Sequence, residues 1–438
     1  MTKVEQALQS ARETRVLEIG VNILNRLPAM LTEQFPGKKV IIVADETTYG
    51  VAGRAALEYL NSAGKAYEKP FIFTDPDLYA EYKYLEQLED TLSKTEAIPI
   101  AVGSGTINDL TKLASSRTGR NYLCVATAAS MDGYTAFGAS VTYKGDKQMF
   151  TCPAPQAVLA DIEIIRHAPS ELTAAGYADL FAKIPAGGDW ILSDVLEIEP
   201  VEPTAWSIVQ DGLQDALAHP GGAREGEVEA ITSLIEGLML GGFAMQHART
   251  SRPAAGAEHQ FSHLWDMEHH THNGKTPSHG FKVGIATLYV SALFEQMLQH
   301  PFEQLDIEAC CAQWPDWEQQ VENAKAMFAD TDFLGAVLDE IRVKYITKTE
   351  LAQQLLILKA NWPAIRARLS QQLIPSAEVR RRLQLVGAPV EPEEIGISKT
   401  RLRASFLRAQ HLRRRFTILD VAVRTACLDL WLDQIFGN

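Results

Sequence analysis

Six of the eleven histidines lie in one stretch of the chain, residues 251–284. They are His259, His263, His269, His270, His272 and His279. His259 and His263 are four residues apart in a segment with a helical pattern, so both side chains would project from one face of a helix. His279 follows a loop marked by glycine and proline, NGKTPSHG, and begins a second apolar helix. Imidazole is the commonest side-chain ligand for metals, and this spacing is compatible with a metal site.

Two histidines from consecutive helices would need a third ligand. A carboxylate from elsewhere in the chain would complete an open catalytic site, with three protein groups and one position left for substrate. The glutamate that follows the first histidine in the HExxH pattern of zinc proteases is absent here. A cluster of histidines in a loop is also typical of a solvated polar surface, so the cluster alone leaves both interpretations open.

The segment AGYADLFAK, residues 175–183, offers a carboxylate. Asp179 and Lys183 are four residues apart and would pair across one turn of a helix, which is ordinary helix stabilisation. In the functional interpretation, Asp179 is the ligand that the histidine cluster lacks.

A glycine-rich turn follows a predicted buried strand and begins a helix. It consists of Gly103, Ser104, Gly105, Thr106 and Ile107. Glycines at such a turn let the backbone approach a pyrophosphate, and the helix N-terminus supplies N–H donors. Asn108 stands where the third glycine of a GxGxxG pattern would be, and similar turns also occur for steric reasons alone. The turn predicts nucleotide binding without establishing it.

Two further segments follow predicted strands. Asp45 ends the strand 38–45, where an acid can accept hydrogen bonds from a ribose and favours NAD over NADP; it would equally cap the next helix. Small and hydroxylic residues after the strand near 121–126 would leave room for a ligand. They are Thr127, Ala128, Ala129 and Ser130. Asp132-Gly133 belongs to the same site or is only a turn.

The pattern of the chain predicts how these residues are positioned. Apolar strands near 38–45, 67–74, 97–105, 121–130 and 157–165 alternate with helical segments, which indicates βαβ units and a parallel sheet. ASVTYKGDKQMF predicts a hairpin that turns at Lys144, Gly145 and Asp146. After about residue 165 nearly every segment has a helical period. We therefore expect an α/β domain over residues 1–165 and an all-helical domain over residues 166–438.

Composition restricts the class of protein. The 438 residues carry a net charge of −14, which argues against nucleic acid or an anionic membrane surface as the main partner. The one basic run, residues 399–415, is more typical of a solvated helix face. Five cysteines without CxxC spacing fit a reducing compartment. We see no signal peptide and no run of 18 apolar residues, and expect a cytoplasmic protein without a membrane span.

Five segments together resemble a known family. GSGTIND, TAASMDGY, AGYADLFAK, SRPAAGAEHQFSHLWD and SHGFKVG, in this order and spacing, resemble the sn-glycerol-1-phosphate dehydrogenases, and most closely their bacterial AraM-like branch. That family belongs to the superfamily of iron-containing alcohol dehydrogenases, glycerol dehydrogenases and dehydroquinate synthases. The resemblance covers roughly residues 15–290. It implies a Rossmann-like dinucleotide-binding α/β domain followed by an all-helical, metal-binding domain of the dehydroquinate synthase-like type.

The resemblance also implies roles for single residues. The metal ligands would be Asp179, His259 and His279. The groups facing substrate would be Asp132, Asp179 and His263, with Asp132 and His263 as catalytic groups. The dinucleotide would contact Asp45, Gly103, Ser104, Gly105, Thr106, Ile107, Thr127, Ala128, Ala129 and Ser130. One position departs from the family: Ala136, with Thr135 beside it, stands where a serine usually contacts the cofactor. Either a nearby hydroxyl makes this contact with the cofactor, or the contact is lost.

The implied reaction is reduction of dihydroxyacetone phosphate to sn-glycerol-1-phosphate with NAD(H) or NADP(H) and one divalent metal: zinc, nickel or iron, between which the ligands do not decide. His263 would relay the proton. The alternatives are a glycerol or polyol dehydrogenase, a dehydroquinate synthase-like lyase that uses NAD transiently, and a non-catalytic nucleotide-binding protein. The partner would be a phosphorylated triose, for which Lys183, Arg252 and Lys282 lie near the motifs. The product suits phospholipid metabolism, and a homodimer is permitted.

Overall fold

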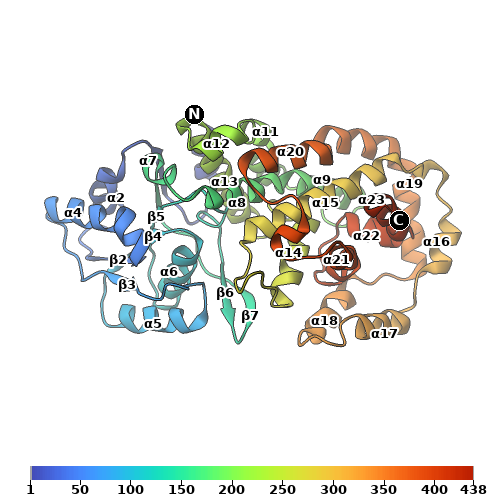
Figure 1. Cartoon of the computed structure of the whole chain (residues 1–438), viewed down its shortest axis with the longest axis horizontal. Helices are drawn as coiled ribbons and strands as arrows, with labels where there is room; N and C mark the ends of the chain where they lie inside the picture. The colour runs from blue at the N-terminus through green and yellow to red at the C-terminus, as the bar shows by residue number, and fades with distance from the viewer. Residues whose placement is uncertain (1, 438) are drawn as a thin grey trace. The chain divides into compact units, whose positions relative to one another are not determined.

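The computed structural model describes residues 2–437, which fold into two compact units (Figure 1). The first unit contains the chain up to Leu180, together with Thr204–Ser251 and Leu385–Gly387. The second contains Phe181–Pro203, Arg252–Gln384 and the chain from Ala388 onward.

A six-stranded sheet forms the centre of the first unit. Its strands, in spatial order, are β1 (Val16–Gly20), β8 (Ala157–Asp161), β5 (Leu123–Ala126), β4 (Ile98–Gly103), β2 (Val40–Asp45) and β3 (Phe71–Phe73). Every neighbouring pair is parallel. In the register, Gly103 lies opposite Ala126, so the segments that follow β4 and β5 leave the sheet at the same edge. This is the edge where parallel sheets of this kind bind ligands.

Helices precede, connect and follow these strands, as the alternating pattern predicts. They are α1 (Lys3–Ser10), η1 (Leu24–Arg26), α2 (Leu27–Gln34), α3 (Glu46–Thr48), η2 (Tyr49–Gly53), α4 (Arg54–Ser62), α5 (Tyr82–Ser93), α6 (Gly105–Arg117) and α7 (Ile162–Ile165). In β2, five of six residues are buried, because helices cover both faces of the parallel sheet. Part of the core forms where Ile42, Val102, Val125 and Leu159 of the sheet pack with Leu31 and Ala56 of the helices.

A separate antiparallel hairpin joins β6 (Ala139–Tyr143) to β7 (Asp146–Phe150). Its turn consists of Lys144 and Gly145, which have φ values of 54° and 89°. Two consecutive positive φ angles match the right-handed twist of the flanking strands. The predicted hairpin is confirmed, with Asp146 already the first residue of β7.

Three elements of the first unit bear directly on the site. They are α8 (Ser170–Phe181), whose last residue enters the second unit, and α13 (Val228–Ala248) with the loop between β5 and β6. Shorter helices complete this part: α10 (Pro203–Gln210), α11 (Leu213–Ala216) and α12 (Pro220–Glu225). By length and composition α13 could cross a membrane, but 67% of its apolar window is buried, as expected for a core helix.

In its described residues, the regular elements of the second unit are all helices, joined by loops and one isolated bridge between His272 and Lys275. Its helices are α9 (Lys183–Val195), α14 (Ala257–Met267), α15 (His279–Gln299), η3 (Phe302–Gln304), α16 (Ile307–Gln313), α17 (Trp317–Met327), α18 (Leu334–Lys344), α19 (Lys348–Gln372), α20 (Ser376–Val386), η4 (Pro392–Ile395), α21 (Lys399–His411), α22 (Ile418–Arg424) and α23 (Leu428–Phe436). The predicted fold class, an α/β part followed by an all-helical part, is confirmed. The domain boundary at residue 165 stays a prediction; it lies shortly after the last strand, β8, which ends at Asp161.

Candidate functional site

Two of the predicted metal ligands lie together in the second unit. His259 is on α14 and His279 is the first residue of α15. Their ring centroids are 5.2 Å apart, and each ring offers a nitrogen within 4.8 Å of the other. Ser278 caps the start of α15, where its hydroxyl accepts from the Phe281 N–H at 3.3 Å. The packing of α14 against α15 thus brings together two imidazoles that are 20 residues apart in the sequence.

Each of these rings is held through its Nδ1 atom. His259 Nδ1 lies 2.8 Å from Glu258 Oε1, and His279 Nδ1 lies 3.3 Å from the hydroxyl oxygen of Ser262. Glu258 and Ser262 are fully buried. A partner at Nδ1 fixes the orientation of an imidazole and makes Nε2 the nitrogen for a metal.

The start of α14 is fixed by a buried carboxylate. Asp189 accepts from the N–H groups of Ala257 at 2.7 Å and Ile418 at 2.6 Å. Burial, with the Glu258 carboxylate nearby, raises the pKa of Asp189 to about 8. Arg252 is fully buried and donates to the carbonyl oxygens of Asp189 and Phe416, both at 2.9 Å. These bonds give Arg252 a scaffolding role, whereas the sequence had suggested it as a phosphate partner.

The remaining histidines of the cluster have different surroundings. His263 lies one turn after His259 on α14, and desolvation, together with the charge of Arg413, lowers its pKa well below its usual range. It is therefore neutral near neutral pH. His270 bonds to the Ile395 carbonyl at 2.7 Å through Nε2 and to Arg401 at 2.8 Å through Nδ1. Both ring nitrogens of His270 thus have protein partners, so a structural role accounts for this histidine without metal binding.

Lys282, a second cation near the motifs, is paired with a carboxylate inside the protein. Lys282 on α15 is almost fully buried and forms an ion pair with Asp266. The pair couples α15 to α14, since Asp266 lies in the helix that carries His259. Lys183 begins α9 and is also buried.

In the first unit, α8 lies against the loop after β5. Asp179 is fully buried on α8, and its Oδ2 accepts from the backbone N–H of Asp132 at 3.1 Å. A Cβ atom on Gly176 would lie 2.7 Å from the Ala129 carbonyl carbon and closer still to its oxygen. Only a glycine lets the helix backbone approach the loop this closely. The structure therefore places three predicted segments together: the loop 127–130, Asp132 and Asp179.

The same loop is held from its other side by α6. Lys112 is buried and donates to the carbonyl oxygens of Gly133 at 2.9 Å, Ala136 at 2.9 Å and Gly138 at 3.0 Å. Asn108 donates to the Gly133 oxygen at 3.3 Å and accepts from the Tyr122 hydroxyl at 2.9 Å. The residue at the place of the third glycine thus has a structural task, which accounts for the incomplete GxGxxG pattern.

The glycine turn connects β4 to α6 at the sheet edge. A Cβ on Gly103 would lie 2.6 Å from Ile107 Cβ, so close packing within the turn requires glycine there. Thr127 N–H donates to the Gly103 oxygen at 3.2 Å, which ties the turn to the loop after β5. Ser104 is the N-cap of α6, and its side chain makes no capping hydrogen bond. The first N–H groups of α6 keep the geometry that suits an anion.

Asp45 has the capping role that one of its two interpretations predicts. Its Oδ1 accepts from the Thr48 N–H at 2.7 Å, and its own N–H donates to the Thr48 hydroxyl at 3.2 Å. This reciprocal pair begins α3. Contact with a ribose stays a prediction for this residue.

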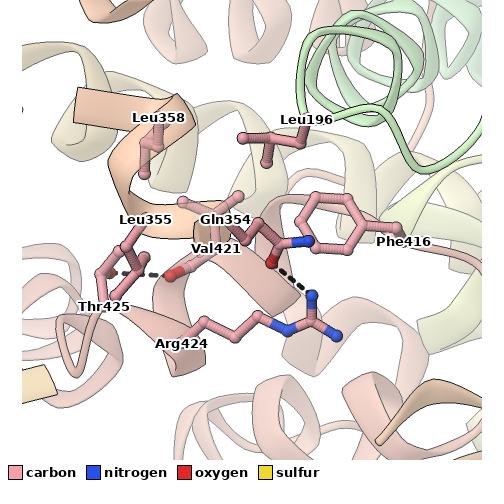
Figure 2. A pocket seen from close by; sticks show the side chains of 8 residues that line it. All are labelled: Leu196, Gln354, Leu355, Leu358, Phe416, Val421, Arg424 and Thr425. Atoms are coloured by element: carbon pink, nitrogen blue, oxygen red, sulfur yellow. Dashed lines mark hydrogen bonds between the residues drawn. The ribbon is translucent and has the colours of Figure 1, made fainter. Parts of the chain in front are cut away.

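A small cavity lies elsewhere in the second unit (Figure 2). It measures about 10 Å³, room for one water molecule. The side chains around it include Leu358, Val421 and Phe416, and Arg424 donates to Gln354 at its edge. None of the predicted site residues lines it, so it is a packing void.

Comparison with known proteins identifies the family of this chain. Residues 18–169 match the family model for iron-containing alcohol dehydrogenase. A glycerol-1-phosphate dehydrogenase, NAD(P)+, of Halalkalibacterium halodurans is 36% identical over 289 residues, 66% of this chain and 72% of the relative. One of Geobacillus thermodenitrificans is 29% identical over 387 residues, 87% of this chain and 86% of the relative. The chain belongs to the glycerol-1-phosphate dehydrogenase family. It is an oxidoreductase of the iron-containing alcohol dehydrogenase superfamily.

Solved structures support the same fold. A probable glycerol dehydrogenase from Sinorhizobium meliloti 1021 superposes with a TM-score of 0.59 at 16% identity, covering 97% of this chain and 98% of that one. Glycerol dehydrogenase from Schizosaccharomyces pombe gives a TM-score of 0.60 at 14% identity, covering 98% and 92%. At this level of identity the likeness concerns the fold alone.

The departure of this chain from the glycerol-1-phosphate dehydrogenase pattern now has a structural context. Thr135, the hydroxyl beside Ala136, is fully buried, and its Oγ1 donates to the Met239 carbonyl of α13 at 2.7 Å. Ala136 contributes its carbonyl oxygen to Lys112. Because the Thr135 hydroxyl is bonded to α13, it is a poor replacement for the serine that contacts the cofactor in the family.

Sequence reasoning missed several residues that position the site. Gly176 carried a signal, because a glycine inside a helical segment calls for a packing reason. Glu258 carried a weak signal, since it directly precedes His259 in the sequence. Lys112 carried no signal, since its three acceptors are 21 to 26 residues away and are backbone atoms.

Proposed function

We propose that this protein is a metal-dependent, NAD(P)-linked dehydrogenase that reduces dihydroxyacetone phosphate to sn-glycerol-1-phosphate, reversibly, at C2. The observation that carries the proposal is the pair of buried His259 and partly buried His279, with ring nitrogens within 4.8 Å and a partner at each Nδ1. Membership of the glycerol-1-phosphate dehydrogenase family supplies the substrate class.

The donor groups fit a divalent metal. We assign the ligands as His259, His279 and Asp179, two neutral nitrogens and one carboxylate. Such a set leaves a position open for substrate and suits zinc, nickel or iron. Asp179 belongs to the first unit and the histidines to the second, and the three act as one ligand set only in this proposal.

The sheet edge of the first unit fits a dinucleotide. The start of α6 offers N–H groups to a pyrophosphate, and Gly105 has no closer neighbour for a Cβ than Met131 Cε at 3.5 Å. The loop 127–130 leaves β5 beside this turn. We assign the dinucleotide to Gly103–Ile107 and Thr127–Ser130, with Asp45 toward the ribose.

When bound, the metal polarises the substrate carbonyl as a Lewis acid and the reduced nicotinamide supplies the hydride. The chain's own groups then orient the substrate and move a proton. His263 is neutral near neutral pH, so it can accept a proton at its free-base nitrogen and pass it to the C2 oxygen. Asp132 stands at the loop that α8 and α6 hold, and faces substrate in this assignment.

The test compares dihydroxyacetone phosphate with dihydroxyacetone, using metal-loaded protein and NADH or NADPH. We expect stoichiometric oxidation of the cofactor with strong preference for the phosphate, and loss of turnover in Asp179→Ala and His259→Ala. His269→Ala is the control, since His269 is a half-exposed histidine of the same segment and lies 3.7 Å from Asp332.

Each alternative gives a different result. Equal rates with both substrates would indicate a polyol dehydrogenase. Product formation without net oxidation of NADH would indicate a lyase. Absence of turnover despite bound metal would refute the assigned reaction.

A further inference from the structure

Glu258 is a buried carboxylate that contacts His259 directly. The residue is fully buried, and its Oε1 lies 2.8 Å from His259 Nδ1. The same oxygen accepts from the Gly256 N–H at 2.6 Å. Within the described residues, Oε2 is buried and has no hydrogen-bond partner. An ionised carboxylate only accepts, so the bond to His259 requires a proton on Nδ1.

The Glu258 carboxylate is closely packed against the backbone of the residues before it. A Cβ on Gly256 would lie 2.9 Å from Glu258 Oε2 and 2.8 Å from Ala186 Cα. The Gly256 backbone therefore packs tightly between the carboxylate and α9. The next residue, Ala257, is fixed by its N–H bond to Asp189. Glu258 is thus flanked by backbone that is closely packed at Gly256 and hydrogen-bonded at Ala257, and its Oε1 contacts the imidazole of the following residue.

The two histidines are supported unequally. His279 Nδ1 meets a neutral hydroxyl at 3.3 Å, whereas His259 Nδ1 meets a carboxylate at 2.8 Å. A hydrogen bond to an ionised partner is roughly twice as strong as a neutral one. A carboxylate behind a ligating imidazole also raises the basicity of its other nitrogen.

We propose that Glu258 is a positioning residue that holds His259 as the Nδ1–H tautomer and directs the Nε2 lone pair to the metal. This inference rests on the proposed metal site. Glu258 acts through His259 and touches neither substrate nor metal. Among the imidazole ligands, His259 is then the one on which metal affinity depends most.

Glu258→Gln keeps the size of the side chain and removes its charge. We expect about 10- to 100-fold weaker Zn²⁺ binding, measured on the full-length protein by competition with a chromophoric chelator. Ser262→Ala, which removes the hydroxyl that contacts His279 Nδ1, should weaken binding less than Glu258→Gln does. Glu295→Gln is the matched control, since Glu295 lies on α15 and accepts from the backbone and hydroxyl of Ser376. It should bind Zn²⁺ as the wild type does.

The tautomer is the second readout and needs no active enzyme. In the metal-free wild type labelled with ¹⁵N-histidine, the His259 signals, identified by their absence in His259→Ala, should show a protonated Nδ1. Glu258→Gln should shift this ring toward the Nε2–H form. A merely structural role for Glu258 would lower the melting temperature without moving the tautomer.

Two outcomes would overturn the inference. One is Zn²⁺ affinity in Glu258→Gln equal to that of the wild type; the other is an Nε2–H tautomer in the wild type, which can be read even if the variant does not fold. If the proposed function is wrong, the failure is seen in the wild type itself, which would bind no metal or would not oxidise NADH with dihydroxyacetone phosphate.

Discussion

Gly176→Ala should reduce activity far more than an alanine in a helix normally does. Gly176 lies on α8, where the helix backbone touches the loop after β5. An added Cβ would lie 2.7 Å from the Ala129 carbonyl carbon, 3.0 Å from Ser130 Cα and closer still to the Ala129 oxygen. All three atoms are backbone, so no side chain can rotate to make room.

The size of the effect follows from this distance. To restore normal contacts, α8 and the loop must separate by more than about 1 Å, and a displacement of about 1 Å at a catalytic group already costs about 100-fold in rate. The displacement would strain the 3.1 Å bond between the Asp132 N–H and Asp179, one turn along α8. Overpacking itself costs about 1–3 kcal/mol of stability, and the better helix propensity of alanine returns about 1 kcal/mol.

The assay is kcat/KM for dihydroxyacetone phosphate with the preferred nicotinamide, alongside thermal unfolding. We expect a loss of about 100-fold in kcat/KM, which corresponds to about 2.7 kcal/mol of transition-state stabilisation. Gly221→Ala is the matched control, because Gly221 lies in α12 and a Cβ there would meet nothing within 4 Å. This control should unfold and turn over like the wild type.

Activity within threefold of the wild type in Gly176→Ala would refute the reasoning. A lower melting temperature with unchanged kcat/KM would also contradict it, because α8 would then be able to move without displacing reacting groups.

Three further predictions concern other groups. His263→Ala should lower kcat while metal content, measured by atomic emission, stays the same; an unchanged kcat would exclude a proton relay. Lys112→Met removes the ammonium donor from three loop carbonyls, of which, in the described part of the chain, only that of Gly133 keeps a second donor, Asn108, and should cost about 3–5 kcal/mol in urea unfolding; a cost below about 1 kcal/mol would contradict the bonding scheme. Since the pKa of Asp189 is raised to about 8 by burial, the unfolded chain releases this proton at lower pH than the folded one does. The contribution of Asp189 to the free energy of unfolding is therefore lost as pH rises from about 4 to 8, at up to about 1.4 kcal/mol per pH unit. In Asp189→Asn, the free energy of unfolding should decrease less steeply over the same pH range.

The strands could be predicted because burial on both faces leaves a plain sequence pattern. KKVIIVAD is continuously apolar, and in the structure β2 is the buried strand between β4 and β3. The hairpin was predictable for a different reason, since Gly145 accepts one of the two positive φ angles that a tight turn demands, although Lys144 takes the other as a non-glycine residue. In both cases the information is local to a few residues.

The histidine pair was predictable in part. Spacing indicated that His259 and His263 share one face of a helix and that His279 begins another, and both helices exist. The approach of His259 to His279 depends on how α14 packs against α15, which no local pattern gives. The position of Glu258, the partner of His259, is set by the Gly256 N–H and by burial. The role of Lys112 comes from bonds to backbone carbonyls far along the chain. Neither feature leaves a local pattern in the sequence.

The glycines of the turn after β4 show why a motif alone was weak evidence for a nucleotide. Gly103 is required by the protein itself, since a Cβ there would collide with Ile107 whether or not a ligand is bound. Gly105 is different, because a Cβ would meet only Met131 at an ordinary 3.5 Å, so internal packing does not demand glycine. Asn108, which breaks the pattern, holds the loop through Gly133. The physical case for a dinucleotide at this turn therefore rests on Gly105 and on the start of α6, where the N-cap side chain makes no capping bond, and gains nothing from Gly103.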